Sequence, residues 1–224
     1  MKAWVVLCIV ITLIIAVVVA ARRGVDKCTV LQTIRLDEST RVEIVDDACK
    51  EGLPHTTDAH TIRMTRATWD GARREEVLRH EQVHLAQKGR DANAWRDFYA
   101  REWEYTLHTA PPVMLPTTLA ARLRPNPDTA DAPWALWRGR WLFFPVFGDD
   151  RKLATARVIV WDTETRRVLD APPEQWRAAF CGRSKCPHQY EHPHEISAEY
   201  ITDMESTAPA ATALFSWRAP VKFV

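Results

Sequence analysis

Glycine and net charge are the two features in which this 224-residue sequence is poorest. It contains 7 glycines against 10 tryptophans, and its 30 basic residues are almost balanced by 29 acidic ones. The scarcity of glycine excludes a flexible polymer and indicates a tightly packed domain. The balanced charge provides no basic stripe with interleaved aromatic residues, so we expect no nucleic-acid partner.

Uncharged stretches are short everywhere except near the amino terminus. Residues 3–21 carry no charge and are dominated by valine, isoleucine and leucine, and Arg22 and Arg23 follow at once. A run of this length can span a bilayer, so we expect residues 1–23 to form a single-pass transmembrane anchor before one soluble domain, residues 24–224. The competing interpretation is a cleaved signal peptide ending in small residues, which would make the protein secreted.

Cysteine is also sparse, with 5 in the chain, and one of them (Cys8) lies in the apolar run. The remaining even set suits two disulfides in an oxidising compartment. The basic residues after the apolar run instead weakly favour a cytoplasmic domain, so the side of the membrane stays undecided. The four cysteines that could form disulfides are Cys28, Cys49, Cys181 and Cys186.

A second interpretation applies to the last two cysteines. Cys181 and Cys186 are close enough to close a short disulfide loop, which is the default expectation. With His188 and His192 they could instead form a small structural zinc site, because thiolates and imidazoles suit that metal.

The most informative motif is H-E-x-x-H, formed by His80, Glu81 and His84. On a helix the two histidines lie one turn apart on one face, where both can bind a zinc ion. The glutamate projects beside the metal and can take a proton from an activated water molecule. The alternative is a solvated helix whose histidines merely cover its polar face.

The residues around the motif favour a helix of about twenty residues. Asp70 can cap its start, Glu75 and Glu76 suit its first turn, and Lys88 with Gly89 suits its end. Gln87 is expected only to pack on the flank of this helix.

Alternating polar and apolar residues predict a β-hairpin from residues 29–34 and 40–45, and a third strand at 61–65. We expect the motif helix to pack on this antiparallel sheet. Further on, two more hairpins are predicted from residues 134–137 with 140–147, and 156–161 with 166–169. A proline-rich loop, residues 111–133, precedes them.

A second helix is predicted from about residue 92 to residue 107, with Trp95, Phe98 and Tyr99 on its apolar face. Glu102 shares that face, so it is either a buried, paired carboxylate or an alternative metal ligand. Its distance from His84 is similar to that of zincins whose third ligand is a glutamate on the next helix.

The late segment from His188 to Tyr200 carries the other candidate ligands. Pro193 suits the first turn of a helix, and Glu195 and Glu199 then share one face. A catalytic zinc held by two histidines needs a third protein ligand and an open position, which Glu195 suits, while Glu199 could orient a ligand by a hydrogen bond. Tyr190 could donate to the oxyanion of a tetrahedral intermediate, although packing is the commoner role of a tyrosine.

Taken together, these segments resemble the zincin-type metallopeptidases of the gluzincin kind, a group that includes uncharacterised proteins of large DNA viruses. The resemblance implies that Glu195 is the third zinc ligand, that Glu199 is its neighbour, and that the substrate is a peptide or protein. The sequence departs from the pattern at His194, which makes His194 a rival ligand. The matching segments are His80 to Gln87, Trp95 to Trp103, Asn126 to Asp128, and Pro193 to Glu199.

These observations predict an α+β fold in which a zincin-like domain with a small antiparallel sheet and a β-rich insertion follows the anchor. The expected function is that of a membrane-anchored zinc metallopeptidase with Glu81 as general base. One alternative is a non-catalytic structural or binding protein, such as a virion component, that retains this fold. Another is a binding module in which protein ligands fill every position of a structural zinc.

Overall fold

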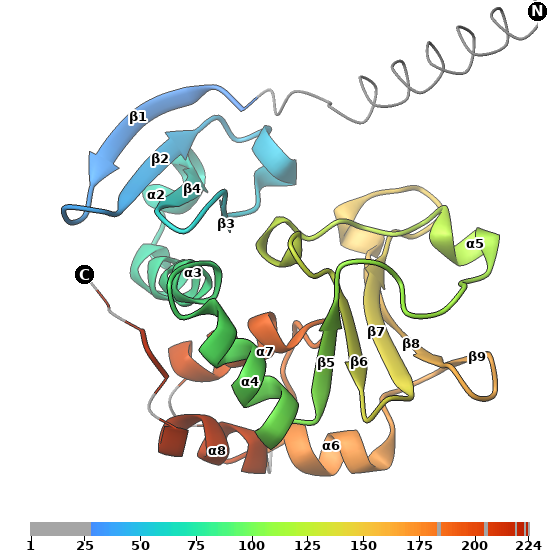
Figure 1. Ribbon diagram of the computed structural model, residues 1–224. Coiled ribbons are helices and arrows are strands. Elements are labelled where there is room, and N and C mark those ends of the chain that lie inside the picture. The colour runs from blue at the N-terminus through green and yellow to red at the C-terminus, as the bar shows by residue number, and fades with distance from the viewer. Residues whose placement is uncertain (1–27, 183–184, 204–205, 218, 222, 224) are drawn as a thin grey trace, which may run out of the picture.

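The computed structural model describes residues 28–182, 185–203, 206–217, 219–221 and 223. The predicted anchor, residues 1–23, and its signal-peptide alternative lie outside this part of the chain. Among the described residues no helix is both long and apolar enough to cross a membrane. The fold of the described part is α+β, as predicted, with two separate sheets (Figure 1).

The first sheet has four strands in the order β1-β2-β4-β3. The predicted hairpin of β1 and β2 is confirmed, but β4 pairs with β2 in parallel, so the expectation of an antiparallel sheet is wrong at this pairing. The reason is the connection of residues 46–60, which returns the chain to the end of the sheet where β2 begins. The strands are β1 (Val30–Arg35), β2 (Arg41–Val45), β3 (His55–Thr56) and β4 (Thr61–Thr65), and the connection contains the 3-10 helix η1 (Cys49–Gly52).

The motif helix is α3 (Arg74–Lys88), which is shorter than predicted. Asp70 does not cap it, because a separate short helix, α2 (Arg66–Trp69), precedes it and ends at Asp70. Thr65 caps α2 by accepting a hydrogen bond from the backbone N–H of Thr68. Helical structure therefore begins earlier in the chain than the sequence pattern predicted.

The second helix, α4 (Ala92–Glu102), ends five residues before the predicted limit of Leu107. Glu104 has a φ of 58°, and a right-handed α-helix cannot continue through a residue with a positive φ. Strand β5 (Tyr105–His108) begins directly after it. Glu102 is therefore the last residue of α4, and it is exposed.

The second sheet is an antiparallel meander of five strands, and both predicted hairpins are confirmed. Arg138 and Gly139 connect the first hairpin, and both have a positive φ, as a tight two-residue turn requires. The proline-rich region before it is mostly loop and contains the short helices α5 (Thr117–Ala120) and η2 (Pro127–Thr129). The strands that follow β5 are β6 (Trp134–Trp137), β7 (Trp141–Val146), β8 (Arg157–Asp162) and β9 (Arg167–Leu169), with the 3-10 helix η3 (Leu153–Thr155) before β8.

Helix α3 lies between the two sheets (Figure 1). Leu78 and Leu85 pack against the first sheet, whereas Val83 belongs to the larger core that α4 and the second sheet share. Three helices near the carboxyl terminus complete this larger core, which is mainly aromatic. They are α6 (Glu174–Phe180), α7 (Pro193–Thr202) and α8 (Pro209–Trp217).

Both expected disulfides are present, joining Cys28 to Cys49 and Cys181 to Cys186. The alternative zinc site of Cys181, Cys186, His188 and His192 is wrong, because both thiols are used in the second disulfide. The ring of His192 instead lies 3.0 Å from the carbonyl oxygen of Ala132.

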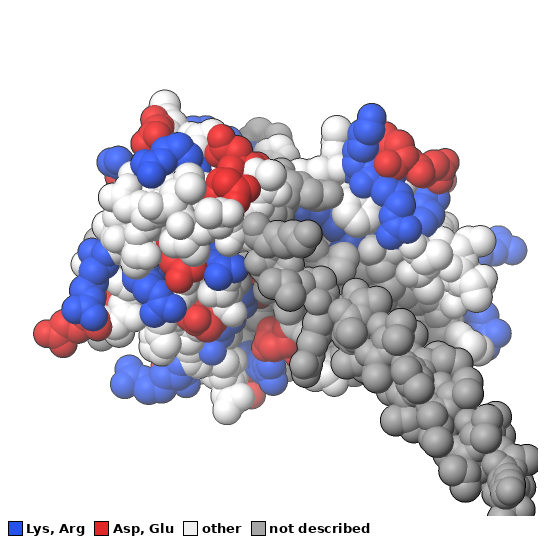
Figure 2. All heavy atoms as spheres, turned by 90° about the horizontal axis from the view of Figure 1, so that it is seen from above, with Lys and Arg blue, Asp and Glu red and all other residues white. Residues whose placement is uncertain are grey.

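On the face shown in Figure 2, acidic and basic side chains are interspersed, without a broad area of one sign. This agrees with the balanced composition of the sequence. That nucleic acid is not a partner stays a prediction.

Asp162 links the turns of the β6–β7 and β8–β9 hairpins through an ion pair in which its own carboxylate is buried and Arg140 is partly exposed. Its carboxylate accepts hydrogen bonds from Arg140 at 3.0 and 2.7 Å and from the backbone N–H of Glu164 at 3.0 Å. The hydrogen bonds from Arg140 lower the pKa of Asp162. Asp162→Asn should reduce the free energy of unfolding near neutral pH by about 2 kcal/mol, measured by urea denaturation of the full-length chain.

The pH dependence of this difference follows from the direction of the pKa shift. Because the pKa is lower in the folded chain, the stabilisation is complete above the ordinary pKa of about 3.9 and is lost as the pH falls through the lower, folded value. The difference between wild type and Asp162→Asn should therefore shrink in acid. Glu104→Gln, which breaks an exposed pair with Arg138, is the control and should change stability little; an equal loss in both variants would contradict the prediction.

Candidate metal centre

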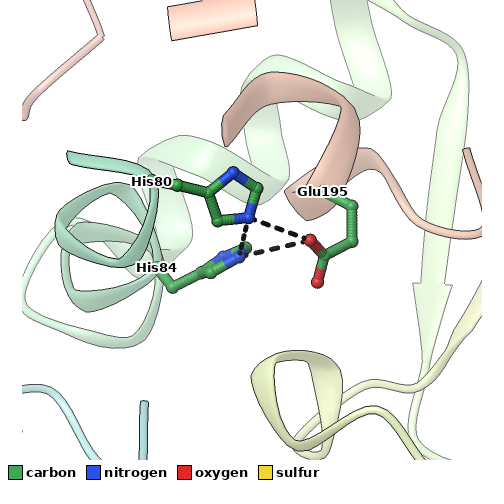
Figure 3. A group of neighbouring side chains, drawn as sticks. All are labelled: His80, His84 and Glu195. Carbon is green, nitrogen blue, oxygen red and sulfur yellow. Dashed lines mark hydrogen bonds and ion pairs between the residues drawn. The ribbon is translucent and has the colours of Figure 1, made fainter. Parts of the chain in front are cut away.

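His80 and His84 lie one helical turn apart on α3 and point to the same side (Figure 3). Their Nε2 atoms are 3.1 Å apart. The side chain of His84 is buried, with 1% of its surface exposed, whereas that of His80 is 18% exposed. His84 is therefore held by packing, whereas His80 is partly open to solvent.

Glu195 meets this pair from α7, 115 positions after His80 in the sequence. Pro193 occupies the first turn of α7, as predicted, and the ring of His192 caps the helix by accepting from the N–H of His194. This fixes Glu195 in the first turn, with its Oε2 atom 3.3 Å from the Nε2 atoms of both metal-site histidines (Figure 3). His80, His84 and Glu195 form a group that could hold a metal ion.

Gln87 fixes the ring of His84. The Nδ1–H of His84 donates to Oε1 of Gln87 at 2.7 Å, so in the neutral ring the lone pair of Nε2 is the one available to a metal ion. The amide nitrogen of Gln87 in turn donates to Ser197 at 2.8 Å and to the hydroxyl of Tyr99 at 3.0 Å. The expectation that Gln87 only packs on the helix flank is wrong, because it joins α3, α4 and α7 behind the histidine.

Gln87→Leu should weaken metal binding by about 10- to 100-fold, because His84 loses the acceptor that sets its orientation and tautomer. Competition with a chromophoric chelator measures the affinity. The matched control is Gln82→Leu on the same helix, since the buried amide nitrogen of Gln82 finds no hydrogen-bond partner among the described residues. Equal affinities for Gln87→Leu and the control would refute this role.

Asn126 fixes the other ligand, Glu195. Its side-chain nitrogen donates to Oε1 of Glu195 at 2.8 Å, while its side-chain oxygen accepts from the N–H of Asp128. Each oxygen of Glu195 thus has a separate role, with Oε1 held by Asn126 and Oε2 directed at the histidines. The sequence indicated Asn126 only as part of a proline-rich loop and of a segment that carries the family resemblance, and it assigned the side chain no role.

Glu81 lies beside the group as a buried carboxylate, and its Oε2 atom has no hydrogen-bond partner among the described residues. Asp128 lies close to it, because ligand atoms of Glu81, His84 and Asp128 all fall within 4.8 Å of one another. Asp128 is itself anchored: it accepts from the backbone N–H of Thr56 at 2.7 Å and pairs with Lys88 at 3.3 Å. The sequence pattern did not indicate Asp128 as a site residue, and it placed Lys88 only at the end of the helix.

The surrounding charges favour a cation. Burial, and then the charge of Asp128, raise the pKa of Glu81 well above its usual value. Burial opposes protonation of His84, but the nearby carboxylates, with Glu195 first, raise its pKa to about 10. Conversely, His84 and His80 hold the pKa of Glu195 well below its usual value although burial opposes this shift. Three carboxylates around two imidazoles therefore suit a bound metal ion.

The group opens into a cleft of about 850 Å³. His80, Glu81 and Glu195 line it together with Asn126 and Asp128. A cleft of this size is typical of a site for a small molecule or a few residues of a peptide.

The structure does not bring together all of the predicted site residues. Glu102 is exposed at the end of α4 and takes no part in the metal group, so its choice as an alternative ligand is wrong. His194 is buried but points elsewhere: its ring packs against Tyr99 and His192, and it is not in the group either. A histidine in the first turn of α7 cannot share the direction of its neighbour Glu195.

Two further assignments need correction. Tyr190 packs half-buried against Phe143 and Trp176 rather than lining the cleft, so it is not placed to donate to an oxyanion there. Glu199 lines the cleft, but its carboxylate accepts from the backbone N–H groups of His188 and Gln189 instead of orienting a metal ligand. It stabilises the loop before α7.

No family model matches this sequence, and no curated protein or solved structure is similar to it.

Proposed function

We propose that this chain is a zinc-dependent hydrolase of peptide bonds, with His80, His84 and Glu195 as zinc ligands and Glu81 as general base. The observation that carries the proposal is the convergence of the three ligand atoms, which are 3.1 to 3.3 Å apart. The choice of a peptide substrate rests on the resemblance to zincin-type metallopeptidases.

The spacing of the ligand atoms supports zinc in particular. Zinc binds nitrogen and oxygen ligands at about 2.0–2.1 Å with tetrahedral geometry, and the edge of such a tetrahedron is about 3.3–3.4 Å. Two imidazoles and one carboxylate are typical zinc ligands, whereas calcium and magnesium prefer oxygen. Three protein ligands also leave one position open, as catalytic zinc sites require and structural ones do not.

A zinc ion held by His80, His84 and Glu195 would supply Lewis acidity, which would lower the pKa of a water molecule toward neutrality and polarise a substrate carbonyl. Glu81 accepts the proton of the attacking water and delivers it to the departing amine. Because burial raises the pKa of Glu81, its ionised form depends on positive charge nearby. Glu81 should therefore be ionised, and able to act as a base, mainly when the metal is bound. Gln87 and Asn126 keep His84 and Glu195 oriented throughout the reaction.

For location, we propose that residues 1–23 anchor the protein in a membrane and that the described domain faces an oxidising compartment. The length and apolar character of residues 3–21 support the anchor. The two disulfides support the compartment, because reducing compartments rarely permit them.

The proposal is tested with the full-length chain and a library of fluorescence-quenched peptides. Zinc-loaded protein should cleave members of the library, a chelator should stop the cleavage, and added zinc should restore it. A zinc-loaded chain that cleaves no member of the library would contradict the hydrolase and favour a non-catalytic structural or binding protein.

A further inference from the structure

The cleft beside the metal group contains several charged side chains, and most of them are neutralised within the protein. Arg73 pairs with Glu76 at 2.6 Å, and Lys185 pairs with Asp203 at 3.3 Å. Asp128 is bound by Lys88, which extends from the end of α3. These pairs neutralise Arg73 and Lys185, whereas the carboxylates of the metal group have no basic partners among the described residues other than Lys88 and the two histidines.

Arg124 differs from the other basic residues of the cleft. Of the arginine and lysine residues that line it, Arg124 is the one without an ion pair to any described residue. The positive charge of Arg124 favours the ionised form of the buried carboxyl of Glu191, but these two described side chains form no ion pair. Arg124 is half-buried, so part of it is covered by the protein.

The backbone holds Arg124 in a fixed relation to the metal group. Its N–H donates to the carbonyl of Pro145 on β7 at 3.0 Å, and Leu123 bridges to Val146 on the same strand. Two residues further on, Asn126 binds Glu195. One short segment therefore joins the unpaired arginine to a proposed metal ligand along the wall of the cleft.

We infer that Arg124 binds a carboxylate of the substrate, so that the cleft selects peptides with an acidic side chain or a free carboxyl terminus near the bond to be cleaved. A guanidinium forms two parallel hydrogen bonds with a carboxylate, which gives both affinity and orientation. The inference rests on the proposed function for the nature of the substrate. The two sources of the carboxylate share this chemistry, and matched peptides distinguish them.

The test measures equilibrium binding rather than turnover. The zinc-loaded full-length chain carrying Glu81→Gln is titrated with blocked tetrapeptides that differ only by glutamate or glutamine at one position. A second series compares a free carboxyl terminus with its amide. The carboxylate member of at least one pair should bind about tenfold more tightly, and adding Arg124→Gln should abolish that difference.

Two further variants make the result specific. Arg124→Lys keeps the charge but loses the paired hydrogen bonds, so it should retain a reduced preference in the same direction. Arg101→Gln removes an equally charged, exposed residue of α4 outside the cleft, and it should leave the preference intact. Equal binding of every pair, a preference that survives Arg124→Gln, or no binding at all would overturn the inference.

The binding experiment and the cleavage assay together separate this inference from the proposed function. Cleavage by the chain with Glu81 intact, without an Arg124-dependent preference in binding, would overturn the role of Arg124 and leave the hydrolase standing. An Arg124-dependent preference without any cleavage would support the carboxylate site and contradict the hydrolase.

Discussion

Glu81→Gln should lower kcat by about 10²- to 10⁴-fold while leaving the zinc content unchanged, because the variant loses the proton acceptor but none of the three ligands. Glutamine has nearly the same size and shape, so the packing around this buried position should persist. Because burial raises the pKa of Glu81, the neutral amide of glutamine avoids the cost of burying a charged carboxylate. The variant should therefore fold at least as stably as the wild type.

The matched control is Glu75→Gln, which makes the same chemical change at an exposed position in the first turn of α3. It should retain the wild-type kcat. Steady-state kinetics with a cleavable peptide and elemental analysis of the same samples provide both measurements. Full activity in Glu81→Gln, or loss of zinc together with activity, would refute the assignment of Glu81 as the base.

Removal of the metal should destabilise the folded chain strongly. The ligands come from α3 and α7, and His80 and Glu195 are 115 positions apart, so the complete set exists only in the folded state. Zinc at about a thousandfold excess over its dissociation constant should therefore add about 4 kcal/mol to the free energy of unfolding. Urea denaturation with and without a chelator, followed by tryptophan fluorescence, measures this difference.

A control for this experiment uses His80→Ala, which removes a ligand that is only partly buried. Its unfolding curve should be the same with and without the chelator. If the wild type also unfolds at the same urea concentration in both conditions, the three side chains do not hold a metal in the folded protein.

The parts of the site that could be predicted from the sequence depend on local spacing. His80 and His84 are one turn apart, and this places both on one face of any helix. Pro193 similarly marks the start of α7, which places Glu195 in its first turn. The aromatic face of α4 follows from the same periodicity.

The parts that were missed depend on contacts between distant positions. Gln87 and Ser197 are 110 residues apart, and Asn126 and Glu195 are 69 apart, so no local pattern shows that they form hydrogen bonds. The parallel pairing of β2 and β4 likewise depends on how the chain crosses between them. Helical periodicity gave a wrong prediction for Glu102. It placed this residue on the buried face of α4, but Glu102 lies at the exposed end of the helix.

The most direct test of the central claim is the zinc content of the full-length wild type, Glu195→Ala and Glu102→Ala, measured by elemental analysis after reconstitution. The claim that His80, His84 and Glu195 hold the metal predicts one zinc per chain in the wild type and in Glu102→Ala, and little or none in Glu195→Ala. Zinc retained in Glu195→Ala would contradict the ligand set, and no zinc in the wild type would contradict the metal site itself.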